Sequence, residues 1–268
     1  MMPAQSEVRI VGRLDPSLPA AVTIATYNEA ENLPELLSKL AALDPLVGIV
    51  IIDDNSPDGT GDIADRVAGQ RPGQVAVLHR AGKGGYASAS KAGVKFAFEA
   101  GMPIILTMDA DFSHDPAVVP KLVSAARDAD IVIGSRYVPG GGVENWPWHR
   151  ILLSRMGGGF ARLVTGMPVH DPTGGFRAYR REVLGTIGWW SVDVRGYSFL
   201  MESIFRAWVA GLKIVEVPIT FRDRTRGKSK LSKKIVFEAL IVALRLGMTK
   251  RWPSSLRRYK EKMGETDG

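Results

Sequence analysis

Short apolar runs alternate with amphipathic segments along the first half of the chain. The apolar runs have the length of buried strands, and the segments between them place apolar residues at helical spacing. Strands that alternate with helices at this rhythm predict an α/β fold with a mainly parallel, Rossmann-like sheet and helices on both faces. The predicted strands span residues 21–25, 47–52, 75–78, 104–108 and 131–134, and the predicted helices span about 30–43, 60–68 and 86–100, with another from residue 116.

The rhythm changes after Tyr137, where a glycine-rich loop precedes an amphipathic stretch from Ile151 to Val164. This stretch contains Gly157–Gly159, and glycines inside a helix cost roughly 1 kcal/mol each relative to alanine. Either the helix breaks there or another segment packs very closely against it. The remaining predicted elements are a helix over about 199–210, a strand over 214–221 and a last helix over 235–248.

We find no internal repeat and no clean domain boundary in the chain. The sequence therefore predicts a flexible N-terminal lead-in over residues 1–19, a single domain over 20–250 and a basic C-terminal tail over 251–268.

Polar clusters follow four of the predicted strands: Tyr27–Glu29, Asp53–Asp58, Asp109–Asp111 and Ser135–Arg136. In sheets of this kind the ligand site lies at the carboxyl ends of the strands, so these clusters are expected to meet. Alternate side chains at a strand end point the same way, which lets the two aspartates of Asp109–Asp111 face one point. Hard oxygen ligands at that spacing suit magnesium or manganese bound to a phosphate. Taken alone, the pair would be a helix cap beside a loop aspartate.

Composition narrows the class of protein. Of the 268 residues, 45% are hydrophobic and 24% are charged, which is typical of a protein with a substantial core, and the lack of cysteine excludes disulfides and thiolate metal sites. Residues 1–20 lack the apolar core of a secretory signal. The last predicted helix contains Glu238 and Arg245 and is shorter than the roughly 20 apolar residues that a bilayer span needs. We therefore expect no transmembrane helices.

Charge is unevenly distributed along the chain. Residues 222–260 contain 13 Lys or Arg against Asp223 and Glu238, a net charge of +11, which leaves −4 for the remainder of a chain whose net charge is +7. Such asymmetry indicates an anionic partner at the C-terminal end, whether phosphates, an anionic membrane surface or nucleic acid. The basic segment 222–234 lies inside the folded pattern, and its glycine and spaced cations favour a lid that closes over phosphates rather than a merely solvated loop.

Five motifs in family order carry a resemblance to a known family. They are Ala25–Glu29, Asp53–Thr60, Met108–Asp111, Gly134–Tyr137 and the pair Arg224 and Lys230. From about residue 22 to about residue 246, the chain resembles the family 2 inverting glycosyltransferases of GT-A fold, and among them the polyprenol-phosphate (dolichol-phosphate) mannose synthases. An Asp-X-Asp motif alone is a weak signal, whereas the five together are highly specific.

The resemblance implies an enzyme that transfers mannose from GDP-mannose to a polyprenyl monophosphate, with inversion and with a divalent metal, magnesium or manganese. The product would be a lipid-linked sugar donor. The acceptor phosphate is already anionic near neutral pH, because its second pKa is about 6, so no strong general base is needed. The enzyme is expected to be cytoplasmic and peripheral on the cytoplasmic face of a membrane, where a membrane-protein partner is a further expectation.

The resemblance also implies roles for individual residues. The residues implied to contact the nucleotide are Ala25, Tyr27, Glu29, Ile52 and Asp54, with Tyr27, Ile52 and Asp54 at the base. Asp109, Ala110 and Asp111 are implied to form the diphosphate and metal site, with Ser113 as a further metal ligand. Arg136 is implied to contact the diphosphate or the acceptor phosphate, and Arg224 and Lys230 to close over the phosphates. The implied catalytic set is Asp111, Arg136, Arg224 and Lys230.

Two positions depart from the pattern of the family. Ala25 stands where relatives usually have proline, and Ser113 stands where many have glutamine as a metal ligand. A serine hydroxyl ligates less firmly, so the metal is expected to depend more on the donor's own phosphates.

Several residues keep a structural alternative. Glu29 can be a helix N-terminal charge, and Arg136 can pair with a structural carboxylate. Asp53 is expected to be structural, as are the imidazoles His79, His149 and His170. For the lipid, the candidate segments are the loop 138–148, the stretch 151–164 and the last helix, with Trp146 and Trp148 beside Arg150 and Arg155 suited to an interface or else ordinary core and surface residues.

Three other functions remain open at this point. The chain can be a polyprenyl-phosphate glucosyltransferase that uses UDP-glucose, or a transferase to a soluble acceptor. It can also be a non-catalytic nucleotide-binding membrane scaffold, against which the intact Asp109 and Asp111 argue. Nucleic acid is not expected as a partner, because the basic tail has no recognition motif behind it.

Overall fold

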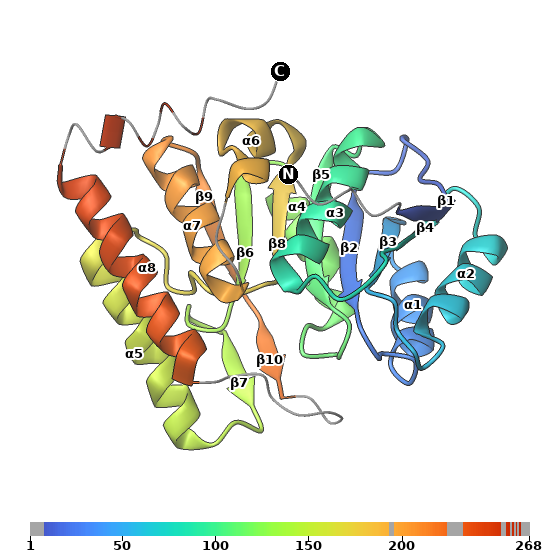
Figure 1. The fold of residues 1–268 in the computed structure, drawn as a ribbon, viewed down its shortest axis with the longest axis horizontal. Coiled ribbons are helices and arrows are strands. Elements are labelled where there is room, and N and C mark those ends of the chain that lie inside the picture. Colours follow the sequence, from blue (N-terminus) through green and yellow to red (C-terminus); the bar gives the residue numbers. More distant parts are fainter. Residues whose placement is uncertain are drawn as a thin grey trace.

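The computed structural model describes residues 8–192, 196–223, 233–252, 256, 257, 259, 261 and 263. Its centre is an eight-stranded sheet in the order β1-β4-β3-β2-β5-β8-β6-β9 (Figure 1). The strands are β1 (Arg9–Gly12), β2 (Ala21–Thr26), β3 (Gly48–Asp53), β4 (Val75–His79), β5 (Ile104–Asp109), β6 (Ile131–Ser135), β8 (Arg177–Arg180) and β9 (Ile214–Pro218). Within this sheet, β1 and β8 run antiparallel to their neighbours and the other pairings are parallel. The predicted mainly parallel sheet is confirmed.

Helices cover both faces of the sheet, as predicted, and each face has its own apolar core. One core packs under α1 (Leu33–Ala41), α2 (Thr60–Gln70) and α4 (Val119–Ala125). The other lies beneath the helices α3 (Tyr86–Glu99), α5 (Trp148–Thr165), α6 (Arg181–Thr186), α7 (Gly196–Val209) and α8 (Lys233–Arg251). Helices α5 and α8 pack side by side at the β9 end of the sheet (Figure 1). Short 3-10 turns, η1 (Pro116–Val118) and η2 (Trp189–Ser191), complete the chain.

The predicted flexible lead-in over residues 1–19 is wrong for its second half. Strand β1 pairs with β4 at the edge of the sheet, and Leu14 is buried. Three of the four side chains of β1 are exposed, so this strand has no apolar periodicity that would reveal it in the sequence. The basic tail over 251–268 lies largely outside the described residues.

The predicted strand over 214–221 is in fact two strands. Strand β9 pairs with β6, and after Pro218 the chain leaves the sheet to form β10 (Thr220–Arg222), which pairs in parallel with β7 (Gly142–Glu144). Pro218 has no backbone N–H to donate, so the break falls where the ladder is weakest. Strands β7 and β10 form a small separate sheet beyond the main one (Figure 1).

Helix α5 is continuous through its three glycines, which decides between the two alternatives left open by the sequence. A Cβ atom at Gly158 would lie 3.2 Å from the backbone oxygen of His170, whereas nothing lies within 4 Å of such an atom at Gly157 or Gly159. Close packing of another segment, and not a helix break, is therefore correct at Gly158, where α5 approaches the loop that precedes β8.

Candidate functional site

A cavity of about 460 Å³ lies at the carboxyl ends of the central strands. We call its lining by strand-end residues the polar end and its lining by apolar residues of α5, α7 and α8 the apolar end. The predicted site residues that line the polar end are Ala25, Tyr27, Glu29, Asp54, Asp109, Ala110, Asp111 and Arg136. The apolar end is lined by Leu153, Phe160, Ala161, Met201, Ala239, Leu240 and Ala243.

Three strand ends turn through the same backbone conformation. Asn28, Asn55 and Phe112, which follow β2, β3 and β5, each have a φ of 59°. Asparagine adopts this left-handed conformation at little cost, but a phenylalanine there is strained by about 1–3 kcal/mol. The tight turn at Phe112 falls immediately after Asp111, and such strain is typical of functional sites.

The Asp109–Asp111 segment is organised by His114. The imidazole Nδ1 accepts a hydrogen bond from the Asp109 backbone N–H at 3.1 Å, and the ring stacks on Phe176 at 4.9 Å. Because Nδ1 is an acceptor, the neutral ring has its proton on Nε2. Burial lowers the pKa of His114 despite the nearby charges of Asp109 and Asp111, so the ring is neutral at physiological pH.

The residues fit a divalent metal that brings ligands with its substrate. Asp109 is about one-third exposed toward the cavity, and Asp111 is held by the Ser113 N–H, which donates to its Oδ1 at 3.1 Å. Within the part of the chain that the structure describes, no group of three or more His, Cys, Asp or Glu side chains is placed to hold a metal. Two carboxylates can hold magnesium or manganese when phosphate oxygens and water complete the coordination.

Ser113 lies behind the cavity wall. It is 1% exposed and does not line the cavity, and its Oγ has no hydrogen-bond partner among the described residues. An orphaned buried hydroxyl next to two carboxylates is compatible with a metal ligand, and that role stays a prediction.

Asp53 and Asp54 have separate roles. Asp53 accepts hydrogen bonds from Ser56 Oγ at 2.6 Å and from the Ser56 N–H at 3.2 Å, which agrees with the structural role expected for it. Asp54 lines the cavity, is 4% exposed, and its Oδ2 accepts from the Gly84 N–H at 3.1 Å. Its Oδ1 lies 2.9 Å from Nη1 of Arg80 in an ion pair that does not have hydrogen-bond alignment, so this oxygen has no hydrogen-bond partner among the described residues.

Glu29 lines the cavity, as expected of a nucleotide contact, whereas Ile52 does not. The side chain of Ile52 is fully buried and lies against Gly93 of α3. Its predicted place beside the base stays a prediction. Glu29 lines the cavity and also accepts from Asn32 Nδ2 at 2.8 Å just before α1, so it combines a place in the nucleotide site with a place at a helix start.

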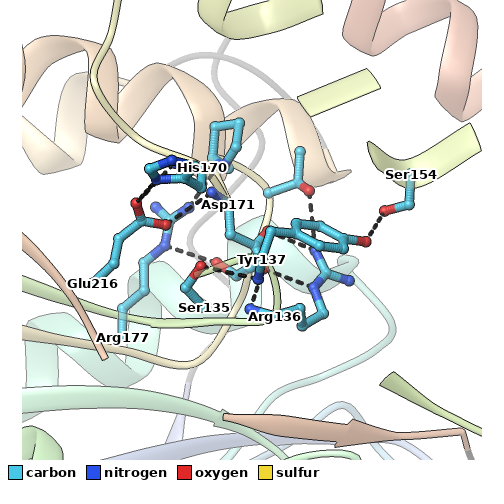
Figure 2. Close-up of polar contacts among 11 residues, drawn as sticks. Ser135, Arg136, Tyr137, Ser154, His170, Asp171, Arg177 and Glu216 are labelled. Atoms are coloured by element: carbon cyan, nitrogen blue, oxygen red, sulfur yellow. Dashed lines mark hydrogen bonds and ion pairs between the residues drawn. The ribbon is translucent and has the colours of Figure 1, made fainter. Parts of the chain in front are cut away.

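Arg136 pairs with Asp171, a partner that the sequence did not identify (Figure 2). Its Nη2 and Nε donate to the two carboxylate oxygens at 2.6 Å and 2.7 Å, and its backbone N–H donates at 3.1 Å. Asp171 is completely buried. Burial alone would raise the pKa of Asp171, but the charge and hydrogen bonds of Arg136 and the charge of Arg177 lower it below its ordinary value. The structural alternative for Arg136 is thus realised, and its contact with phosphate stays a prediction.

The loop around Asp171 is held from two sides by opposite charges (Figure 2). Glu216 of β9 accepts from the backbone N–H groups of His170 and Asp171 at 2.8 Å and 2.9 Å. Arg177 of β8 is fully buried and donates to the carbonyls of Pro172, Gly174 and Leu200. His170 contacts Glu216 through Nδ1 at 2.8 Å, which agrees with the structural role expected for this imidazole.

Several residues of the cavity wall were not predicted to contact the nucleotide or a phosphate, although Trp146 and Arg150 were candidates for the lipid interface. Arg150 and Ser154 lie one turn apart on α5, and Trp146 stacks under the Arg150 guanidinium at 4.0 Å. Lys83 lies over the ring of Tyr27 at 3.8 Å. The i, i+4 spacing of Arg150 and Ser154 was the available signal in the sequence.

Arg150 also forms an ion pair with Asp223, with Nη1 3.0 Å from Oδ2. Asp223 belongs to the basic segment and is its last described residue before position 224. The predicted lid residues Arg224 and Lys230 lie outside the described residues.

The family to which the sequence is similar agrees with the geometry of this site. The sequence matches the model of glycosyl transferase family 2 over residues 21–188. The chain belongs to this family. The resemblance inferred from the five motifs is therefore confirmed, and the protein is a glycosyltransferase.

Curated relatives within glycosyl transferase family 2 are similar over most of the chain. Polyprenol monophosphomannose synthase from Mycolicibacterium smegmatis is 44% identical over 237 residues, 88% of this chain and 89% of its own. Undecaprenyl-phosphate mannosyltransferase from Micrococcus luteus is 44% identical over 85% of this chain and 94% of its own. Dolichol-phosphate mannosyltransferase from Pyrococcus furiosus is 43% identical over 82% of this chain but 61% of its own.

Solved structures show the same fold at low sequence identity. Glucosyl-3-phosphoglycerate synthase from Mycobacterium tuberculosis, solved with Mn²⁺, uridine diphosphate and phosphoglyceric acid, has a TM-score of 0.61 at 16% identity and covers 88% of this chain and 78% of its own. The same enzyme solved with Mg²⁺ and uridine diphosphate has a TM-score of 0.59 at 18% identity, with coverages of 88% and 79%. The predicted GT-A glycosyltransferase fold is confirmed.

Proposed function

We propose that this glycosyltransferase transfers mannose from GDP-mannose to a polyprenyl monophosphate, with inversion at the sugar carbon. The observation that carries the proposal is a single cavity lined both by the carboxylate-rich strand ends and by apolar residues of α5, α7 and α8. A nucleotide sugar fits the first chemistry and the isoprenoid end of a lipid phosphate fits the second. The names of the relatives that are 43–44% identical support the same reaction.

Guanine suits the base pocket better than uracil. The Asp54 carboxylate lines the cavity, and its side chain is 6% exposed. Guanine offers two adjacent donors, N1–H and the 2-amino group, to such a carboxylate. Uracil offers one donor between two carbonyl oxygens, which a carboxylate repels. The side chain of Tyr27 lies on the same wall.

In this proposal the diphosphate binds at the end of β5. Asp109 and Asp111 would hold magnesium or manganese there, and the bound ion would neutralise charge on the departing diphosphate. Arg136, held rigid by Asp171, and Lys83 present cations to the same cavity. Arg224 and Lys230 remain the proposed lid cations.

In this proposal the acceptor phosphate binds against α5. Arg150 and Ser154 line the cavity from α5, the helix that also contributes Leu153, Phe160 and Ala161 to its apolar lining, so a phosphate bound to them would have its isoprenoid chain beside these apolar residues. The monoanionic or dianionic phosphate attacks the sugar carbon directly, in a single displacement that inverts the configuration. The protein's task is to align the two reactants, which can supply several powers of ten in rate.

The outer surface of α5 and α8 is proposed to dock on a membrane. Of the helices that the structure describes, none has both the length and the hydropathy to cross a bilayer. Large apolar side chains on these two helices are nevertheless exposed, among them Trp148 at 74%, Leu163 at 83% and Phe237 at 66%. Arg155, Arg162, Arg245, Lys250 and Arg251 lie on the same helices. Apolar residues beside cations are typical of surfaces that lie on anionic bilayers, here on the cytoplasmic face.

The reaction is tested with labelled GDP-mannose and polyprenyl phosphate, with and without Mg²⁺ or Mn²⁺. Metal-dependent formation of polyprenyl-phosphate mannose, together with release of GDP, is the expected result. Turnover of UDP-glucose in place of GDP-mannose would establish the glucosyltransferase alternative. Nucleotide binding with no turnover of either donor would establish the non-catalytic scaffold.

Membrane docking is tested by co-sedimentation with vesicles that contain anionic lipid. Leu163→Glu is expected to lower binding at least about fivefold, since it removes apolar burial and adds a repelled charge. The matched control is Leu46→Glu, an exposed leucine outside α5 and α8. Equal losses in both variants, or none, would contradict the assignment of this surface. Salt-dependent binding to DNA or RNA that exceeds vesicle binding would instead support the nucleic-acid alternative.

A further inference from the structure

Arg80 lies immediately behind the proposed base-binding carboxylate. It follows β4, its side chain is 14% exposed, and it is not among the residues that line the cavity. Its backbone N–H donates to the Asp53 carbonyl at 2.9 Å, which fixes the point from which the side chain extends. Its Nη1 lies 2.9 Å from Oδ1 of Asp54, and its Nη2 donates to Oγ of Ser88 at 2.7 Å.

The glycine-rich turn before α3 is built around this guanidinium. A Cβ atom at Gly84 would lie 2.1 Å from Nη2 of Arg80, so only glycine allows the turn to pass there without displacing the arginine. The Gly84 N–H donates to the second oxygen of Asp54 at 3.1 Å. Arg80 therefore connects the end of β3, this turn and the first turn of α3. The two oxygens of the Asp54 carboxylate are contacted separately, one by the Arg80 guanidinium and the other by the Gly84 N–H.

The ionisation of Asp54 depends on the same neighbours. Burial raises the pKa of Asp54 above its ordinary value and the adjacent Asp53 raises it further, whereas the charge of Arg80 and the N–H groups of Gly84 and Gly85 oppose the rise. Loss of the guanidinium would leave a buried carboxylate without its cation, and such groups shift toward the neutral form. A protonated carboxyl group donates a hydrogen bond where guanine requires an acceptor.

We propose that Arg80 is a positioning residue for nucleotide selectivity: it holds the Asp54 carboxylate charged and oriented so that the carboxylate accepts a hydrogen bond from the guanine edge. The inference rests on the proposed function, because it takes guanine as the base. Arg80 acts through Asp54 and does not itself contact the cavity, so it determines selectivity without forming part of the binding surface.

Calorimetric titration with GDP, inosine diphosphate and UDP, at fixed Mg²⁺, tests the proposal in the full-length protein. Inosine lacks the 2-amino group, so the ratio of GDP to inosine diphosphate affinity reports the contact with Asp54. Wild type is expected to favour GDP by about tenfold, as one hydrogen bond to a charged group implies. Arg80→Gln is expected to bind GDP about tenfold or more weakly, with a ratio near one and with affinity that falls further from pH 8 to pH 6.

Two variants separate charge from geometry. Arg80→Lys keeps a cation but loses the planar fork, so it is expected to lose selectivity without acquiring the pH dependence. Ser88→Ala removes the other contact of the guanidinium and is expected to leave the ratio within about twofold of wild type. The matched control is Arg9→Gln, which breaks an exposed Arg–Asp pair with Asp65 outside the cavity.

The outcomes distinguish this inference from the proposed function. A wild type that prefers UDP would overturn the guanine assignment itself. A wild type that prefers GDP, with the same ratio in Arg80→Gln or in Arg80→Lys, would overturn the role of Arg80 alone. A loss of selectivity in Ser88→Ala equal to that in Arg80→Gln would also overturn it, because the effect would then come from the turn and not from Asp54.

Discussion

Replacing Asp171 by asparagine tests the buried ion pair that fixes Arg136 in the cavity wall. In the structure the carboxylate is completely buried and accepts three hydrogen bonds from Arg136, two from the guanidinium and one from the backbone N–H. Asparagine has nearly the same shape but no charge. Its amide nitrogen would place a donor against the donor Nε or Nη2, so one of the two guanidinium contacts is lost whichever way the amide lies.

The size of the effect follows from burial. The Arg136 side chain is 10% exposed, so its charge has little access to water once its partner is neutral. Removing one partner of a buried ion pair costs about 3–5 kcal/mol of the free energy of unfolding. Asparagine retains one acceptor oxygen, which places Asp171→Asn near the lower end, at about 3 kcal/mol. A domain is typically stable by about 5–15 kcal/mol, so the loss is readily measured.

Urea unfolding, followed by tryptophan fluorescence, measures this loss as a function of pH. Because the pKa of Asp171 is lowered in the folded state, the ion pair stabilises the protein fully above the ordinary aspartate pKa of about 3.9 and progressively less as pH falls toward the folded-state pKa. The difference between wild type and Asp171→Asn should thus be constant from about pH 7 to 5 and shrink below about pH 4. The control, Asp62→Asn, changes an exposed aspartate of α2 and should stay within about 0.5 kcal/mol. A difference under about 1 kcal/mol at pH 7, or one that grows in acid, would refute the reasoning.

Three further predictions address the metal site, helix packing and the buried imidazole. Asp111→Ala is expected to lower metal-dependent transfer by about a thousandfold or more, measured as release of labelled mannose from GDP-mannose, and an unchanged rate would defeat a mechanism in which Asp111 holds the metal. Gly158→Ala is expected to destabilise the protein, because the new Cβ atom would lie 3.2 Å from the backbone oxygen of His170. Gly159→Ala, whose Cβ atom would have nothing within 4 Å, should stabilise α5 by up to about 1 kcal/mol. Thermal unfolding compares the two variants directly, and equal shifts of the midpoint would contradict the close approach at Gly158. Burial lowers the pKa of His114, so stability is expected to decrease as pH falls below the ordinary histidine value of about 6.5, where the unfolded chain binds the proton first; an NMR titration in which His114 titrates at 6.5 or above would contradict this.

The parts of the site that local sequence pattern determines were predictable. Asp54, Asp109 and Asp111 each follow a buried apolar run, and parallel strands bring their carboxyl ends to one edge, so their convergence on one cavity followed from the order of elements. The same logic placed Tyr27 and Arg136 in the cavity wall. Local periodicity and the geometry of a parallel sheet suffice for residues of this kind.

The parts that depend on contacts distant in sequence were not predictable. Asp171 lies 35 residues from Arg136 in the chain, and only the insertion of β8 between β5 and β6 brings its loop beneath the arginine. Strand β8 itself is four residues long and has arginine at both ends, so it has no apolar run to reveal it.

The charge of the cavity leads to a prediction about the basic C-terminal segment and the metal. The described residues that line the cavity include five acidic side chains, Glu29, Asp54, Asp109, Asp111 and Asp223, and three basic ones, Lys83, Arg136 and Arg150. Arg136 is largely neutralised by Asp171, so a nucleotide diphosphate would meet net negative charge. Productive binding therefore requires positive charge from elsewhere, and residues 222–260 have a net charge of +11. We expect GDP affinity to fall at least about tenfold when Mg²⁺ is chelated and again when Arg224 and Lys230 are both changed to Gln, as calorimetry would show. Metal-independent GDP affinity in the wild type would contradict this division of charge.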